Sequence, residues 1–234
     1  MAAVARDLAS SSLDEAVVDA SAAHGNLAVD IFRHPSLVRL RAEPAAEPAT
    51  APAWTCAELA GRLCELTAGV DSAALSAAVH LVRDAQRAGD PVAWITARAA
   101  TFHPPDAAAA GVDLSALVVV RARDARTAGR AADVLLRSGA YGLVVLDLGT
   151  DAAMPTPLQG RLVQLALKHD AAVLCLTEKG RDDPSLGSLV SLRGQVSRRR
   201  APGGFACRID VLKDKRRGPG WRWREVRRGP DGLH

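Results

Sequence analysis

Short apolar runs alternate along residues 54–177 with longer segments of helical period. Runs of this length, apolar at successive positions, are typical of strands that are buried on both faces of a sheet. We therefore expect five such strands, all of them buried. They are "RLCEL" (62–66), "VAWITA" (92–97), "ALVVVR" (116–121), "YGLVVLDLG" (141–149) and "AAVLCLT" (171–177).

The segments between these runs predict helices. Residues 72–88 carry an apolar stripe at helical spacing, formed by Leu75, Val79, Val82 and Ala85. Asp124 is a favoured residue for capping a helix that runs to Arg137, and Gly139 is a favoured residue just beyond its end. Residues 156–169 predict a third helix.

Beyond Thr177 the helical pattern stops. Residues 188–200, 204–215 and 221–226 predict strands joined by Gly- and Pro-containing turns, an arrangement typical of antiparallel pairing. The expected fold class is therefore α/β, with a mostly parallel sheet flanked by helices and completed by antiparallel C-terminal strands.

Composition divides the chain into four parts. Residues 1–41 predict a helical extension, 42–53 a Pro/Ala linker ("AEPAAEPATAPA"), 54–215 the core, and 216–234 a basic tail rich in Trp and Arg. No apolar run is long enough to span a membrane, and the N-terminus lacks the layout of a secretory signal. We expect a cytoplasmic, nucleoid-associated protein.

Charge is unevenly distributed. The net charge is +4, but residues 193–234 contain 13 Lys or Arg and 4 Asp or Glu. Such a basic end predicts a polyanion or an acidic protein surface as partner, and a solvated tail is the alternative. The four cysteines are scattered without metal-ligand spacing, and we interpret them as free thiols rather than as zinc ligands.

The stretch "RRGPGWRWREVRR" (216–228) interleaves two tryptophans with arginines. Tryptophan faces can stack on bases while arginines contact phosphates, so this segment is a candidate for binding single-stranded DNA. The alternative is that the tryptophan face packs on the protein body. The candidate DNA- or partner-binding residues are Arg198, Arg199, Arg200, Arg216, Arg217, Trp221, Arg222, Trp223, Arg224, Arg227 and Arg228.

The stretch "ELTAGVDSAALS" (65–76) joins the first predicted strand to the first helix, where an ATPase carries G-x-x-x-x-G-K-[ST]. Its length and position match a phosphate-binding loop, whereas its residue types do not. The alternative is an ordinary strand–turn–helix connection.

The order of these pieces resembles the RecA recombinase family over residues 54–215. "GVDL" (111–114) precedes a strand, "LLRSGA" (135–140) ends a helix, and the strand 141–149 carries an acidic residue, Asp147. "SLVSLRGQVSRRR" (188–200) and "VLKDK" (211–215) are similar to the closing strands of that family.

The resemblance implies that most of the ATP site is lost. Ala68 and Ala73 stand where the family has glycines, Ala74 replaces the lysine, and Leu75 replaces the hydroxyl residue. Thr96-Ala97-Arg98 stands at the catalytic glutamate, and Asp106 falls near the aromatic residue that stacks on adenine. The remnants are Asp147, Lys213 and Lys215. We expect no cofactor and no catalysis, with a divergent ATPase or a RecA-like DNA-binding recombination protein as the alternative.

A RecA-like chain with a degenerate ATP site and a basic end also resembles the ImuA family of DNA-damage mutagenesis cassettes. The resemblance implies a non-catalytic adaptor in SOS-induced translesion synthesis. The implied partners are RecA, an ImuB-like inactive Y-family polymerase, an error-prone replicative-type DNA polymerase and single-stranded DNA.

Overall fold

In the computed structural model, the described residues are 53–68, 72–97, 102–202 and 204–227. The predicted extension 1–41 and all of the linker except residue 53 lie outside them.

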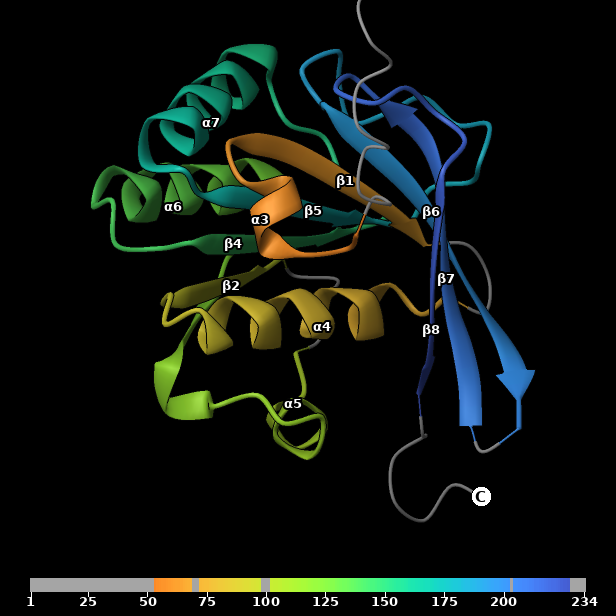
Figure 1. The fold of residues 1–234 in the computed structure, drawn as a ribbon. Coiled ribbons are helices and arrows are strands. Elements are labelled where there is room, and N and C mark those ends of the chain that lie inside the picture. Colours follow the sequence, from red (N-terminus) through yellow and green to blue (C-terminus); the bar gives the residue numbers. More distant parts are fainter. Residues whose placement is uncertain (1–52, 69–71, 98–101, 203, 228–234) are drawn as a thin grey trace, which may run out of the picture. The chain divides into compact units, whose positions relative to one another are not determined.

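Eight strands form one sheet in the order β3-β2-β4-β5-β1-β6-β7-β8 (Figure 1). Pairing is parallel from β3 through to β6 and antiparallel from β6 to β8, so the expected fold class is confirmed. The strands are β1 Arg62–Ala68, β2 Val92–Thr96, β3 Leu117–Arg121, β4 Leu143–Gly149, β5 Ala172–Thr177, β6 Leu192–Ala201, β7 Gly204–Asp214 and β8 Arg222–Arg227.

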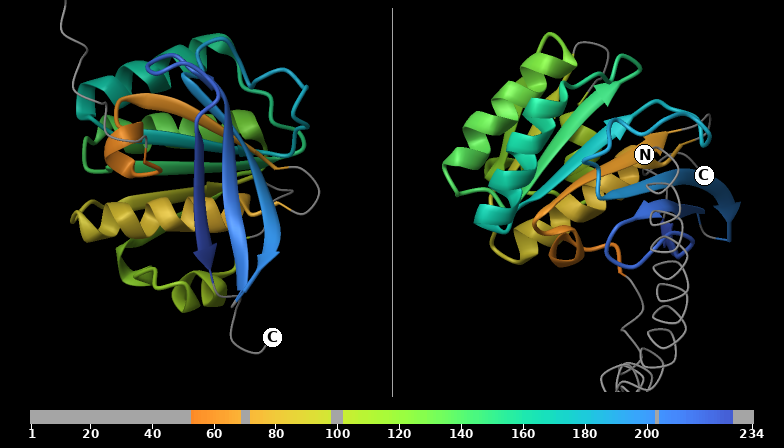
Figure 2. Two further views of the ribbon diagram at one scale, coloured as in Figure 1. Left: turned by 45° about the vertical axis from the view of Figure 1, so that its right-hand side comes forward. Right: turned by 90° about the horizontal axis from the view of Figure 1, so that it is seen from above.

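Helices cover both faces of the parallel part (Figures 1 and 2). On one face α4 packs over β1, β2, β4 and β5, and its hydrophobic cluster continues onto β6 and β7. On the other face α6 and α7 pack on each other and on the strands, forming a second cluster. The helical elements are α3 Cys56–Leu59, α4 Ala74–Arg87, α5 Pro104–Ala109, the 3-10 helix η1 Leu114–Ala116, α6 Ala125–Arg137 and α7 Thr156–His169.

The predicted signals at the ends of α6 are confirmed. The Asp124 side chain accepts a hydrogen bond from the backbone N–H of Thr127 at 2.6 Å, which satisfies a donor that the helix leaves unpaired. Gly139 adopts a positive φ of 70°, a conformation that costs glycine little. The chain therefore turns sharply into β4.

Two burial predictions are wrong. β3 was expected to be a buried strand, but it is the edge of the sheet, and Val118 and Val119 are 42% and 40% exposed. An apolar run indicates a strand, whereas its position in the sheet depends on how the connections cross over. Leu75, expected on the buried stripe of α4, is 51% exposed because the stripe is formed mainly by alanines together with Leu81 and Val82.

Part of the segment predicted as a basic tail lies within the sheet. Residues 222–227 form β8, which pairs with β7 and places Trp223 opposite Ile209. Trp221 and Trp223 are half-buried and pack against the α4-side cluster. The alternative interpretation, in which the tryptophans pack on the protein body, is therefore the observed one.

No helix within the described ranges has the length and apolar character that a membrane span requires.

Candidate functional site

The connection between β1 and α4 lies at the position of a phosphate-binding loop, and residues 69–71 within it lie outside the described ranges. Ala68 ends β1, and the side chains of Ala73 and Ala74 are buried in the α4-side cluster. Ala73 is the residue that precedes the helix, and its side chain makes no capping hydrogen bond. Leu75, in the first turn, points to solvent.

At this helix start, one of the backbone N–H groups is already hydrogen-bonded. A helix N-terminus binds phosphate through unpaired backbone N–H groups, assisted by the helix dipole. Here the N–H of Ala74 already donates to the Ser72 hydroxyl at 3.0 Å, and the carbonyl of Ala73 accepts from Ala77 at 2.9 Å. Among residues 72–75, serine is the only one with a polar side chain.

Asp147 lies near the end of β4, in register with Thr96 of β2 and Leu176 of β5. Burial raises the pKa of Asp147 to about 6, the charge of Glu178 adds to the rise, and the indole of Trp94 opposes it. A buried carboxyl group whose pKa is raised by desolvation is a common feature of functional sites and also occurs in structural positions.

The other two predicted remnants lie elsewhere. The ammonium groups of Lys213 and Lys215 are directed at one acceptor, the carbonyl of Ser188, at 3.5 and 2.7 Å. Burial, aided by the charge of Lys215, lowers the pKa of Lys213. Among the described residues, no hydrogen bond or ion pair joins either lysine to Asp147.

Sequence reasoning missed Glu65, a fully buried carboxylate in the middle of β1. Its oxygens accept hydrogen bonds from the hydroxyl groups of Thr177 and Ser185 at 3.0 and 2.8 Å and from the backbone N–H of Leu186 at 2.9 Å. A charged residue inside an apolar run was the available signal, because a carboxylate is buried only when it is paired.

Arg193 complements this carboxylate from β6. Its Nε lies 3.7 Å from Glu65, and its other nitrogens donate to the carbonyls of Asp183 and Gly180 at 2.5 and 2.9 Å. Lys179 also lies 3.9 Å from Glu65. The network therefore ties the segment between β5 and β6 to the centre of the sheet.

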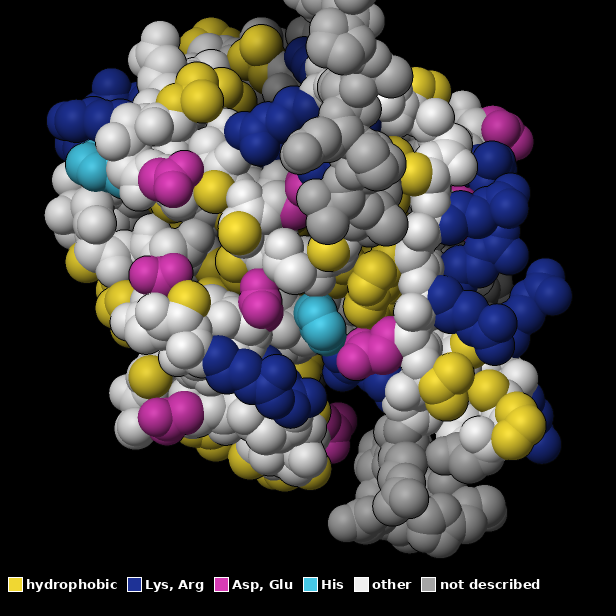
Figure 3. All heavy atoms as spheres, viewed as in Figure 1, with side chains coloured by type: hydrophobic (Ala, Val, Ile, Leu, Met, Phe, Trp, Pro, Cys, Tyr) yellow, Lys and Arg dark blue, Asp and Glu magenta, His cyan; other side chains and the backbone are white. Residues whose placement is uncertain are grey.

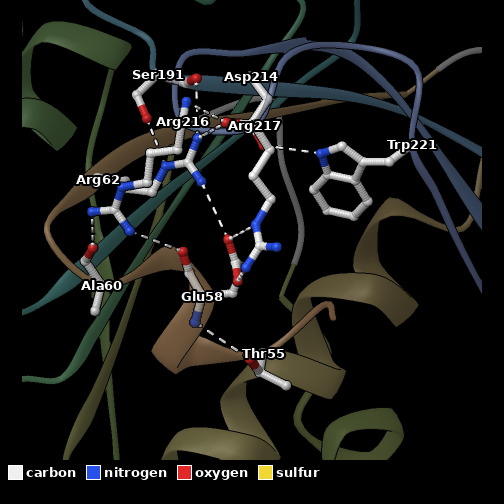
Figure 4. Close-up of polar contacts among 9 residues, drawn as sticks. All are labelled: Thr55, Glu58, Ala60, Arg62, Ser191, Asp214, Arg216, Arg217 and Trp221. Carbon is white, nitrogen blue, oxygen red and sulfur yellow. Dashed lines mark hydrogen bonds and ion pairs between the residues drawn. The ribbon is translucent and has the colours of Figure 1, made fainter. Parts of the chain in front are cut away.

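Two predicted binding residues instead join the turn before β8 to α3, and a third bonds to the end of β7 (Figure 4). Arg217 forms a bidentate ion pair with Glu58, at 3.0 and 2.8 Å. Arg216 donates to the carbonyl of Ala60 at 2.8 Å. The indole N–H of Trp221 donates to Asp214 at 2.9 Å.

Asp214 is the centre of this group, which we call the Asp214 cluster (Asp214, Arg62, Glu58, Arg216, Arg217 and Trp221). Arg62 donates to Asp214 at 2.6 Å, and both side chains are buried. Burial acts to raise the pKa of Asp214, but hydrogen bonds from the Arg216 backbone, Trp221 and Arg62 outweigh it, so the pKa is lowered. These contacts hold the turn before β8 against α3 and the end of β7.

The remaining predicted arginines are distributed over both faces of β6–β8. Figure 3 shows Lys and Arg side chains gathered on the side of the molecule where these strands lie. Arg198 lies over the ring of Phe205 at 5.7 Å, Arg222 pairs with Asp210, and Arg227 pairs with Glu225. The exposed arginines on these strands are Arg198, Arg199, Arg200, Arg222 and Arg224. Arg228 lies outside the described residues.

Within the described ranges, no group of three or more His, Cys, Asp or Glu side chains could hold a metal ion. All four cysteines are free thiols, and burial raises the pKa of Cys64 and Cys56 to about 12. Thiols of this kind stay protonated at neutral pH, so they act as small apolar side chains.

Comparison with known proteins agrees with the fold class. The RecA N-terminal domain model matches residues 55–175, more than half of the chain. The chain belongs to the RecA N-terminal domain family. It is 32% identical to Protein RecA of Salinispora tropica over 167 residues, which cover 62% of this chain and 47% of that protein. With Protein RecA of a Nocardioides species the identity is 41% over 87 residues, 37% of this chain and 25% of that protein.

This member of the family spans less than half the length of these curated relatives. Its fold is similar to the crystal structure of the RadB recombinase, with a TM-score of 0.56 and 15% identity, covering 72% of this chain and 88% of that one. The RecA-like recombinase fold is thus shared.

Proposed function

We propose that this chain is a non-catalytic, RecA-like adaptor of the ImuA kind, acting in SOS-induced translesion synthesis. In this proposal it binds RecA and the error-prone polymerase complex, and the fold is retained for its surfaces. The observation that carries the proposal is the start of α4, where the side chains of Ala73 and Ala74 are buried. The RecA resemblance assigns these two positions to the glycine and the lysine.

The physical reason is the loss of charge-assisted contacts. A phosphate loop binds through several backbone N–H groups and a lysine, and each hydrogen bond to a charged group contributes about 1.5–3 kcal/mol. Without the lysine, and with the Ala74 N–H bonded to Ser72, the triphosphate loses most of this free energy. We therefore expect no saturable binding of Mg-ATP below the millimolar range, measured by isothermal titration calorimetry.

The competing function is a divergent ATPase. It is favoured by Asp147, whose carboxyl group has a raised pKa and lies near the end of β4, a position that can hold a metal–nucleotide complex. Micromolar binding of Mg-ATP that disappears in Asp147→Asn would support the ATPase and overturn the adaptor. The matched control is Asp151→Asn, an exposed carboxylate in the following turn.

The adaptor half of the proposal needs a partner measurement. Purified chain should bind immobilised RecA or the two polymerase partners in the absence of nucleotide, with affinity unchanged by ATP. Binding that needs ATP, or no binding to any of the three partners, would contradict the proposal.

A further inference from the structure

The face of β6–β8 that points away from α4 carries several arginines. Ile209 and Cys207 point into the α4-side cluster, so alternate residues of these strands point to the opposite face. The hydrophobic cluster beneath α6 and α7 includes no described residue of β6–β8, so no helix of that layer covers this face. We call it the basic face, defined by Arg199, Arg208, Arg222, Arg224 and Asp210.

The register places positive charges beside one another on this face. Arg208 lies directly opposite Arg224, an arrangement that is destabilising without a counter-charge. The face has one carboxylate, Asp210, which Arg208 and Arg222 share at 2.6 and 2.9 Å. Arg199 and Arg224 have no ion-pair partner among the described residues. The basic face therefore carries an excess positive charge that an acidic ligand would neutralise.

β8 is also an edge of the sheet. It pairs with β7 on one side, and no described strand pairs with its other side. An edge strand presents a row of backbone N–H and C=O groups with the spacing of another strand. A polypeptide can continue that ladder, whereas a nucleic acid cannot.

The side chains of this region favour the same class of ligand. Proteins that bind single-stranded nucleic acid combine basic residues with exposed aromatic rings on which bases stack. Here Trp221 and Trp223 pack against the α4-side cluster, and the basic face instead presents Val226, which is 52% exposed. Arginines around an apolar residue are typical of protein–protein interfaces.

We propose that β8 binds an extended acidic segment of a partner protein. The segment adds a strand to the free edge of β8, and its carboxylates lie opposite Arg222 and Arg224. Residues at alternate positions of the segment face the side of Trp223. This inference rests on the part of the proposed function in which the chain binds other proteins, and it names the surface and the chemistry of the partner.

The test uses a fluorescently labelled peptide of about ten residues in which Glu and Val alternate, a length sufficient for one strand. Anisotropy should show salt-sensitive binding to the full chain. Arg222→Gln with Arg224→Gln should weaken it about five- to ten-fold, since two cross-strand ion pairs are lost. The matched control removes the same charge from α6, in Arg126→Gln with Arg130→Gln, and should leave binding unchanged.

A second peptide separates strand addition from simple charge attraction. N-methylation of alternate amides keeps every carboxylate and removes the backbone donors, so this peptide should bind much more weakly than its parent. Equal binding of the two peptides, or no effect of the β8 arginine substitutions, would overturn the inference.

Binding of nucleic acid to the basic face is the remaining outcome of the test. If a labelled single-stranded oligonucleotide binds more tightly than the peptide, and that binding is lost in the β8 double variant, the face recognises phosphates and the inference is wrong. Binding of RecA or the polymerases that survives in the double variant would refute this surface while leaving the adaptor function intact.

Discussion

At the scale of single residues, the effect of Asp147 on the stability of the fold depends on pH. Its pKa is raised from 3.8 to about 6 in the folded protein, so between these values the folded state binds more protons than the unfolded state. Ionised Asp147 therefore lowers stability at neutral pH, and this loss is recovered as the pH falls from about 7 to 4.

We predict that Asp147→Asn raises the free energy of unfolding at pH 7.5 by about 1–2 kcal/mol. The advantage should shrink towards pH 4.5, where the wild-type carboxyl group is already protonated. Urea denaturation at both pH values measures this difference. An equal effect at the two pH values would show that ionisation of this carboxyl group is not the cause.

Glu65 gives the second residue-scale prediction. Glu65→Ala leaves Arg193 buried without its carboxylate and removes the acceptor for Ser185 and Leu186, so we expect a loss of about 3–5 kcal/mol. The exposed neighbour of this network, Glu178, is the matched control, and Glu178→Ala should change stability little. Chemical denaturation of both variants tests the role of the network, and equal effects would contradict it.

At the scale of elements, β3 and β4 have similar apolar sequences and different environments. Val145 of β4 is fully buried at the centre of the sheet, whereas Val119 of β3 is 40% exposed at its edge. We predict that Val145→Ala costs about 2 kcal/mol and that Val119→Ala costs about 0.5 kcal/mol or less. Thermal unfolding compares the two, and equal costs would mean that β3 is covered in solution.

The helices α4, α6 and α7 and the strands were predictable because their signals are local, whereas the short helices α3, α5 and η1 were not predicted. Periodicity, the Asp124 cap and Gly139 depend on neighbours within a few residues. The position of β3 and the partners of Arg216, Arg217 and Trp221 depend on contacts between distant segments. Arg217 and Glu58, for example, are 159 positions apart. A run of arginines gives the same sequence signal in two cases. Its charges can bind a partner, or they can pair with carboxylates of the protein itself.

The same limit applies to the candidate site. Ala73, Ala74 and Leu75 stand where the RecA resemblance places the end of the phosphate-binding motif, and this is visible in the sequence because the motif has fixed spacing. That the Ala74 N–H is bonded to Ser72, and that Lys213 and Lys215 lie at the Ser188 carbonyl away from Asp147, required three-dimensional coordinates.

At the scale of the whole molecule, the two ends of the sheet differ in charge and in how helices cover them. The parallel strands are covered by helices on both faces. The antiparallel strands carry the excess positive charge and are covered by α4 on one face. The described chain thus combines a RecA-like body with a basic sheet extension at one end.

This arrangement makes the C-terminal segment part of the fold. Deleting residues 216–234 removes β8 from β7, takes the Arg216 and Trp221 donors away from Asp214, and leaves Glu58 without its bidentate partner. We predict that the deletion lowers the free energy of unfolding by about 3 kcal/mol or more, because buried side chains lose packing and hydrogen bonds together. Arg224→Gln, which removes an exposed charge and no described contact, should stay within about 0.5 kcal/mol of the wild type. Calorimetric melting of the three proteins measures both effects. A deletion variant that melts with the wild type would show that residues 216–234 contribute no stability, and any partner binding lost on truncation would then be a direct effect of the missing segment.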